Sequence, residues 1–213
     1  MMRACVVTVS NRAAAGVYAD RAGPILVAGL RELGFAADEP LVVPDGEPVV
    51  TALREAVAEA YDVVLTTGGT GLNPNDQTPE MTRRVLEVEV PGLAEAVRAY
   101  GVDHGVPTAA LSRGLAGLAG STLIVNLPGS SGGARDGMAV LAPVLRHAVE
   151  QIRGGDHPGA QGGHDTQGGN DTQGGEGTRG GHDTRGGNDT QGGEGTKDKH
   201  GGQDKRDAVS GSQ

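Results

Sequence analysis

The sequence predicts an α/β fold, in which a single doubly wound, mainly parallel sheet has helices on both faces and a disordered C-terminal tail follows. Short apolar, β-branched runs alternate with amphipathic segments, as strands and helices alternate around a parallel sheet. Polar or glycine-bearing loops follow most of these runs. The last 60 residues differ sharply, since they hold only three apolar residues but 20 of the 38 glycines.

The first half of the sheet is predicted from three valine-rich runs. Residues 4–9 (ACVVTV), 41–43 (LVV) and 62–67 (DVVLTT) are apolar and end in polar or glycine-bearing loops, as buried parallel strands do. Between them, Asp20 is predicted to cap a helix that runs to about Leu33. A second helix is expected from Pro48 to about Ala60, because its apolar side chains recur at helical spacing.

The second half is predicted to contain three helices and a buried strand. Thr78 is expected to be the N-cap of a helix that begins with a proline. Another helix should run from Pro91 to about Val102. Residues 108–116 fit either a strand or a loop, whereas 121–127 (STLIVNL) fit a buried strand. A final amphipathic helix is expected from Ala134 to Ile152.

Composition divides the chain into a domain, residues 1–153, and a glycine-rich repeat tail, residues 154–213. Within the tail, residues 161–178 recur as 179–196 with two differences. A segment with so little apolar surface cannot offset the entropy lost on ordering, so the tail is predicted to be disordered.

Charge and residue usage exclude several classes of protein. The net charge is −9, and residues 1–153 carry 17 acidic against 12 basic side chains, so no nucleic-acid partner is expected. No lysine precedes residue 197, which excludes the lysine-bearing P-loop. Cys5 is the only cysteine, which excludes a disulfide framework. With no signal-peptide pattern and no long apolar run, we expect a cytoplasmic protein with no membrane partner.

Four loops are predicted to form a cleft, because ligands of an open parallel sheet bind beyond the carboxyl ends of its strands. These loops are residues 10–12, 44–46, 68–78 and 128–133. Residues 67–71 (TGGTG) would offer exposed N–H groups and hydroxyls to phosphate oxygens, with glycines that permit close approach. A strand-exit turn without a ligand is the alternative interpretation.

Two aspartates follow the predicted strands at this edge. Asp45 ends the second strand, and Asp76 lies between the glycine-rich loop and the next helix. Two carboxylates at neighbouring strand ends can hold Mg²⁺ together with nucleotide phosphates. Turn formation and helix capping are the alternative roles for both.

Residues 66–80 (TTGGTGLNPNDQTPE) resemble the signature TTGGTG-x₄-D-x-TPE of the molybdopterin adenylyltransferases, the bacterial MogA/MoaB-type enzymes. The resemblance continues in three further motifs, which occur in the family's order. They are VTVSNR (7–12), VPD (43–45) and LSRGLAGLAGSTLIVNLPG (111–129). Together the four motifs cover most of residues 3–153.

The resemblance implies Mg²⁺-dependent transfer of AMP from ATP to molybdopterin, which gives adenylyl-molybdopterin and pyrophosphate. Asp45 and Asp76 would be the catalytic carboxylates and the Mg²⁺ ligands. The implied substrate-binding residues are Ser10, Thr67, Gly68, Gly69, Thr70, Gly71, Ser112, Pro128, Gly129 and Ser130. The family further implies a homotrimer or hexamer and a molybdenum-insertion protein as a partner.

Two departures from the family pattern leave other functions open. The first motif usually reads Ser-Asp, but here it is Ser10-Asn11. The late loop usually continues from Pro-Gly to Asn/Gln-Pro, but here Ser130-Ser131 follows. A non-catalytic molybdopterin-binding or assembly protein is therefore an alternative, and a nucleotide pyrophosphatase of the same fold is another. Arg12 and Arg113 are candidate anion contacts, with plain surface positions as the alternative.

Overall fold

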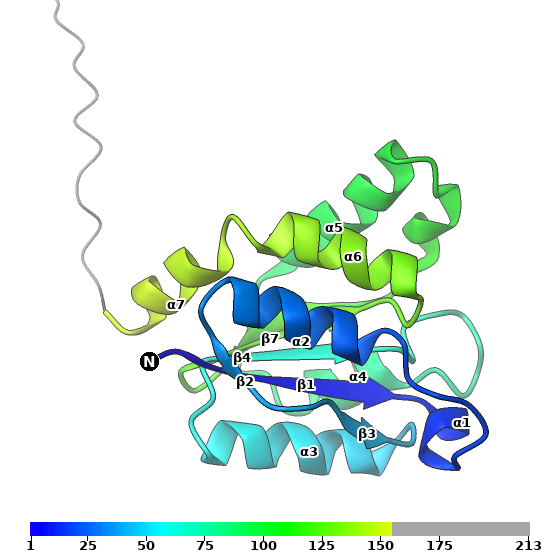
Figure 1. Ribbon diagram of the computed structural model, residues 1–213, viewed down its shortest axis with the longest axis horizontal. Helices are drawn as coiled ribbons and strands as arrows, with labels where there is room; N and C mark the ends of the chain where they lie inside the picture. The colour runs from blue at the N-terminus through cyan, green and yellow to red at the C-terminus, as the bar shows by residue number, and fades with distance from the viewer. Residues whose placement is uncertain (155–213) are drawn as a thin grey trace, which may run out of the picture. The chain divides into compact units, whose positions relative to one another are not determined.

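The computed structural model describes residues 1–154 (Figure 1), and within them seven strands form one sheet. The strands are β1 (Arg3–Val9), β2 (Ala36–Ala37), β3 (Leu41–Val43), β4 (Val63–Thr67), β5 (Val88–Glu89), β6 (Ala116–Ala119) and β7 (Thr122–Leu127). Their order is β2-β1-β4-β7-β6-β5, and β3 pairs with β1 farther along the edge that β2 occupies.

The sheet is mainly parallel, as predicted. Strand β4 lies parallel to β1 on one side and to β7 on the other, with Leu65 opposite Val6 and Val125. Only the two pairings at the far edge, of β7 with β6 and of β6 with β5, are antiparallel. The carboxyl ends of β1, β4 and β7 therefore meet at one edge of the sheet, which is where parallel sheets bind ligands.

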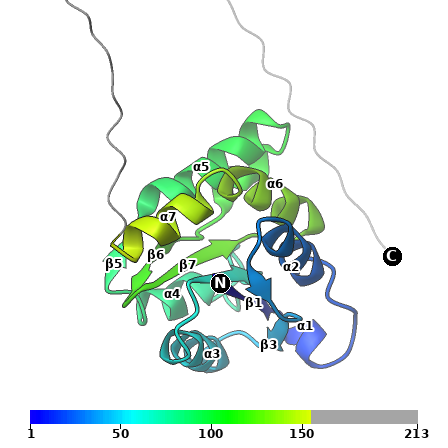
Figure 2. The same ribbon diagram turned by 60° about the vertical axis from the view of Figure 1, so that its left-hand side comes forward.

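Helices cover both faces of the sheet (Figures 1 and 2). They are α1 (Asn11–Ala14), α2 (Gly23–Glu32), α3 (Glu47–Ala58), α4 (Thr78–Arg83), α5 (Pro91–Asp103), α6 (Ser131–Leu141) and α7 (Leu145–Ile152), with a 3₁₀ helix η1 at Pro107–Leu111. Helices α2, α5, α6 and α7 pack on one face, and α3 and α4 pack on the other.

Each face has its own hydrophobic core, because successive side chains of a strand point to opposite sides. On β1, Val6 packs with Leu26 and Leu30 of α2, whereas Val7 packs with Leu53 of α3. All five of these side chains are at most 1 % exposed. This double burial explains why the strands lack an alternating polar pattern.

Several predicted elements differ from those observed. The single helix expected over 134–152 is two helices in the structure. Pro143 lies between them, and a proline has no backbone N–H to donate to the preceding turn of a helix. Residues 107–111 form η1, and β6 begins only at Ala116. The two-residue strands β2 and β5 and the four-residue helix α1 were not predicted, because such short segments show no periodicity.

The two predicted helix caps have different outcomes. The N-cap of α2 is Ala22 and not Asp20. Asp20 Oδ1 nevertheless accepts the N–H groups of Ala22 and Gly23, each at 3.0 Å, so its side chain satisfies two donors at the start of the helix. The prediction for Thr78 is wrong, because Gln77 is the N-cap of α4 and Thr78 is its first residue. The Thr78 N–H donates to Gly69 O at 3.0 Å, which ties this residue to the glycine-rich loop instead.

The predicted tail, residues 154–213, lies outside the described residues except for Gly154. Among the helices of residues 1–154, none has both the length and the apolar character needed to cross a membrane.

Candidate functional site

Two adjoining cavities lie at the carboxyl ends of β1, β4 and β7. One has a volume of about 410 Å³ and the other of about 390 Å³. They share Gly68, Gly69, Asp76 and Gly129, so the two spaces meet at the glycine-rich loop. We call the first the apolar chamber and the second the polar chamber.

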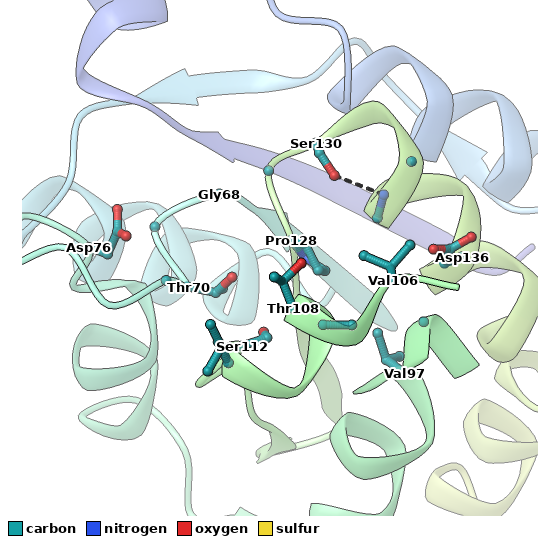
Figure 3. Close-up of a pocket in the computed structure, with 18 residues that line it drawn as sticks. Gly68, Thr70, Asp76, Val97, Val106, Thr108, Ser112, Pro128, Ser130 and Asp136 are labelled. Atoms are coloured by element: carbon teal, nitrogen blue, oxygen red, sulfur yellow. Dashed lines mark hydrogen bonds between the residues drawn. The ribbon is translucent and has the colours of Figure 1, made fainter. Parts of the chain in front are cut away.

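The apolar chamber lies between the glycine-rich loop and the α5–η1 region (Figure 3). Val97, Val106 and Leu111 supply apolar walls, and Ser112 and Asp136 supply polar groups. Figure 3 shows Thr70 and Asp76 on one side of this chamber, with Val97, Val106 and Asp136 on the other. A chamber of this size with few polar groups suits the apolar part of a small ligand.

The polar chamber lies between the loops that follow β1, β3 and β4. Ser10, Asn11, Asp45 and Thr67 contribute to its walls. Arg12, a candidate anion contact, also lines it, and its guanidinium lies 5.2 Å from the centre of the Tyr18 ring. Its polar lining suits the charged part of a ligand better than a ring.

The glycine-rich loop passes so close to its neighbours that side chains would not fit. Gly68 and Gly69 have φ values of +101° and +62°, a region that favours glycine. A Cβ on Gly68 would lie 2.2 Å from Val9 O, and one on Gly69 would lie 2.2 Å from Thr78 Oγ1. These two glycines are therefore required by the fold of the loop itself.

Part of the loop's hydrogen-bonding capacity is used within the protein. Thr67 Oγ1 donates to Pro128 O at 2.8 Å, and the Gly68 N–H donates to Leu127 O at 3.1 Å, which holds the 128–130 turn against the loop. Within residues 1–154, the N–H groups of 69–71 make no hydrogen bond. These three donors are the ones free to bind an anion.

Asp45 is held by Asn11. Asn11 Nδ2 donates to Asp45 Oδ2 at 3.0 Å, and the Asp45 N–H donates to Asn11 Oδ1 at 3.1 Å. The other carboxylate oxygen, Asp45 Oδ1, is buried without a hydrogen-bond partner within the described residues, as is Thr78 Oγ1. Burial raises the pKa of Asp45, the nearby Gln77 N–H opposes this, and the negative charge of Asp76 raises it again. Asp45 Oδ1 is therefore available to bind a ligand.

Asp76 lies at the border of the two chambers. The Asp76 N–H donates to Asn73 O at 2.8 Å, and Asp76 Oδ2 accepts the Asn73 N–H at 3.3 Å. A Cβ on Gly71 would lie 2.7 Å from Asp76 Oδ2, so the carboxylate lies directly over the glycine-rich loop. The loop conformation therefore places this carboxylate beside the free N–H groups.

The three serines among the predicted site residues all accept a backbone hydrogen bond. Ser10 Oγ accepts the Ala13 N–H at the start of α1, at 3.2 Å. Ser130 Oγ accepts the Gly133 N–H at the start of α6, at 3.0 Å (Figure 3). Ser112 Oγ accepts from Gly114 at 3.3 Å. Each hydroxyl still has its own proton to donate to a ligand.

All twelve predicted site residues line one or both chambers. Their roles in binding and catalysis stay predictions. Sequence reasoning did not identify Val97, Val106 and Asp136, which belong to helices or their ends and carry no motif. Arg113 proves to be neither a plain surface residue nor a wall of either chamber, since its side chain binds main-chain carbonyl groups of the loop.

Comparisons with known proteins agree with the motifs. Residues 5–147 match the family described as a probable molybdopterin binding domain. The chain is 36 % identical over 166 residues to the molybdenum cofactor biosynthesis bifunctional protein of Synechococcus elongatus. The matched residues make up 75 % of this chain and 50 % of that protein. The chain thus spans about half the length of this relative.

Two further relatives are matched over most of their own length. The molybdopterin adenylyltransferase of Helicobacter pylori (strain J99) is 35 % identical over 156 residues, 70 % of this chain and 86 % of the relative. The structure of the molybdopterin biosynthesis Mog protein from Mycobacterium ulcerans is 52 % identical with a TM-score of 0.69, covering 71 % of this chain and 99 % of that one. The chain therefore belongs to the family of probable molybdopterin binding domains.

Proposed function

We propose that the chain is a molybdopterin adenylyltransferase, which transfers AMP from ATP to molybdopterin and acts in molybdenum cofactor biosynthesis. The observation that supports this most directly is the meeting of two chambers at one glycine-rich loop, with Asp45 and Asp76 beside it. Both substrates combine a flat heterocycle with phosphate. An apolar space beside a polar one, with free N–H groups between them, suits a reaction that joins two such molecules.

The chemistry requires little more than positioning. An oxygen of the terminal molybdopterin phosphate attacks the α-phosphorus of ATP, a new P–O bond forms, and the bond to the bridging oxygen breaks. Pyrophosphate leaves with the bonding electron pair. The free N–H groups of Gly69, Thr70 and Gly71 would hold phosphate oxygens in place and stabilise the charge that develops on them.

This reaction needs no nucleophile from the protein, and Cys5 is unsuited to be one. Its thiol lies on β1, and burial, together with the negative charges of Glu59 and Asp38, raises the pKa of Cys5 to about 11. A thiol with so high a pKa is almost wholly protonated at neutral pH.

Mg²⁺ fits the residues at this site. Asp45 and Asp76 would hold it, because Asp45 Oδ1 is buried without a hydrogen-bond partner within residues 1–154 and the two carboxylates repel one another electrostatically. No group of three acidic, histidine or cysteine side chains within residues 1–154 could hold a metal alone, so ATP phosphates would complete the coordination. When bound, the ion would neutralise charge on the phosphate oxygens.

The test is pyrophosphate release from ATP and Mg²⁺, with and without molybdopterin. We expect release that depends on molybdopterin and falls by at least about 10²-fold in Asp76→Asn, since a positioned charge contributes on that order. Asp103→Asn, an exposed position on α5, is the matched control.

Molybdopterin binding without pyrophosphate release would support the non-catalytic alternative, which is suggested by Asn11 at a position where the family usually has an aspartate. Release without molybdopterin would support the pyrophosphatase alternative.

Partners belong to the same proposal. The adenylylated pterin is an activated intermediate, so a molybdenum-insertion protein would consume it. The homotrimer or hexamer that the family resemblance implies is checked by light scattering, which gives the mass of the assembly directly.

A further inference from the structure

The Arg113 side chain, in the segment between η1 and β6, reaches across to the loop that carries Asp76. Its Nε donates to Gly71 O at 2.7 Å, and one terminal nitrogen donates to Asp76 O at 2.5 Å. The other terminal nitrogen pairs with Glu80 in the first turn of α4. The Arg113 N–H also donates to Thr70 O at 2.9 Å. Arg113 thus contacts the loop at residues 70–71 and at Asp76, and it also contacts α4, which follows the loop.

These contacts fix the loop from outside. Within residues 1–154, no other side chain donates to the carbonyl groups of Gly71 and Asp76. The loop is also closed at its base by the Thr78 N–H, which donates to Gly69 O at 3.0 Å. The bonds from Asn73 to Asp76 are local and set only the shape of its tip. The Arg113 side chain is only 33 % exposed, so these bonds are partly shielded from competing water.

Arg113 is itself held from the other side. Arg98 of α5 donates to Gly114 O at 2.8 Å and to Ser112 O at 3.4 Å, on either side of Arg113. Ser112 lines the apolar chamber, and Asp76 lines both chambers. A continuous set of bonds therefore runs from α5, through the segment 112–114, to the loop at the border of the two chambers.

We propose that Arg113 is a positioning residue, which holds Asp76 and the N–H groups of residues 69–71 in the arrangement that adenylyl transfer requires. The inference rests on the proposed function. A planar guanidinium has donors in three directions at once, which matches two carbonyl groups and a carboxylate. A lysine ammonium keeps the charge but cannot bind all three in that geometry.

The first test measures backbone hydrogen exchange in Arg113→Lys. We expect faster exchange within residues 70–80, with the rest of the sheet unchanged and a Tm within a few degrees of wild type. Arg83→Lys is the matched control, because Arg83 lies on α4 and pairs with Glu89 at 2.9 Å outside the chambers. Unchanged exchange in residues 70–80 of Arg113→Lys would overturn the proposal.

The second test measures catalysis. In Arg113→Ala we expect kcat for pyrophosphate release to fall by about 10²-fold, with a smaller change in the KM for ATP. Added guanidinium at millimolar concentration should restore part of kcat, whereas ammonium at the same concentration should not. A kcat equal to that of Arg83→Lys, or equal restoration by both ions, would contradict the proposal.

The two tests separate this inference from the proposed function. A wild-type chain without adenylyl transfer would overturn the proposed function, and the Arg113 role in transfer with it. Its exchange data would still show whether Arg113 holds the loop. An active wild type with normal exchange and normal kcat in both Arg113 variants would overturn the inference alone.

Discussion

Asp45 shows how the site places charge at a cost to the stability of the fold. One of its oxygens accepts a hydrogen bond from Asn11, and the other is buried with no hydrogen-bond partner in the described part of the chain. Burial and the negative charge of Asp76 raise the pKa of Asp45. A carboxyl group whose pKa is raised in the folded state favours folding when it is protonated. That contribution is lost as the pH rises through the folded-state pKa, so at neutral pH the ionised Asp45 opposes folding.

The substitution Asp45→Asn should therefore stabilise the protein and inactivate it. The introduced amide would retain an acceptor for Asn11 while losing the buried charge and the repulsion from Asp76. Because the site is partly solvated, we expect a gain of only about 0.5 kcal/mol, or roughly 1–2 °C in Tm at pH 7. Thermal unfolding between pH 4 and pH 8 checks this, since the gain should become smaller as the pH falls and Asp45 takes up a proton.

The pH dependence of wild-type activity is a second check on the charge of Asp45. Pyrophosphate release should fall on the acidic side as Asp45 becomes protonated, at a pH above that of an ordinary aspartate. A Tm gain that is the same at pH 4 and pH 8 would contradict the assignment of the effect to the Asp45 charge.

At the scale of elements, Asn126 joins three parts of the sheet and its helices. Asn126 Nδ2 donates to Thr66 Oγ1 on β4 at 2.9 Å and to Thr82 Oγ1 on α4 at 3.0 Å. Asn126 Oδ1 accepts the Leu115 N–H at 3.3 Å, just before β6. All three polar side chains are at most 2 % exposed, so none can exchange its partner for water.

Asn126→Leu should destabilise the fold by about 2–4 kcal/mol, because buried groups would lose their partners. The corresponding fall in Tm is about 5–15 °C, and urea unfolding gives the free energy. In a Thr66→Val, Thr82→Val background, the same substitution should cost less, since two of the unpartnered groups are then absent. An equal cost in both backgrounds would show that the hydrogen bonds are not the cause.

The elements that sequence patterns predicted well are those whose burial is visible in composition. The runs at 4–9, 62–67 and 121–127 are apolar because both of their faces are covered, and each forms a strand. Strand β5 was missed because Val88 and Glu89 are exposed, so no apolar pattern marks it. Thr78 has the residue type of a helix cap, but its N–H donates to Gly69 O, and no local sequence pattern reveals that partner.

The same distinction applies to the site. Motifs lead to the residues of the glycine-rich loop and to Asp45 and Asp76, because each follows a strand end. They do not lead to the walls of the apolar chamber, which only the packing of α5 and η1 against the loop creates. The role of Arg113 was likewise not visible, since its acceptors are backbone carbonyl groups, which no residue type reveals.

At the scale of the whole molecule, the end of α7 is tied back to the beginning of the sheet. Arg153 at the end of α7 donates to Asp62 Oδ1 at 2.9 Å, and the Arg3 N–H donates to Asp62 Oδ2 at 2.7 Å. One carboxylate thus ties α7 to β1. Val149 of α7 is buried in the larger core cluster, and the family match covers residues 5–147.

A chain shortened to residues 1–154 should therefore unfold at the same Tm as the full chain, within about 1 °C, and release pyrophosphate at the same rate. Residues 155–213 contain only Ala160, Ala208 and Val209 as apolar side chains, too little surface to extend a core. A chain shortened before Leu145 is the informative contrast, because it removes Leu145 and Val149 from the core and should lower the Tm by more than about 10 °C.

If removal of residues 155–213 alone lowered the Tm by several degrees, the domain would extend beyond residue 153. If it changed only the rate of pyrophosphate release, the repeat segment would act on the site rather than on the fold.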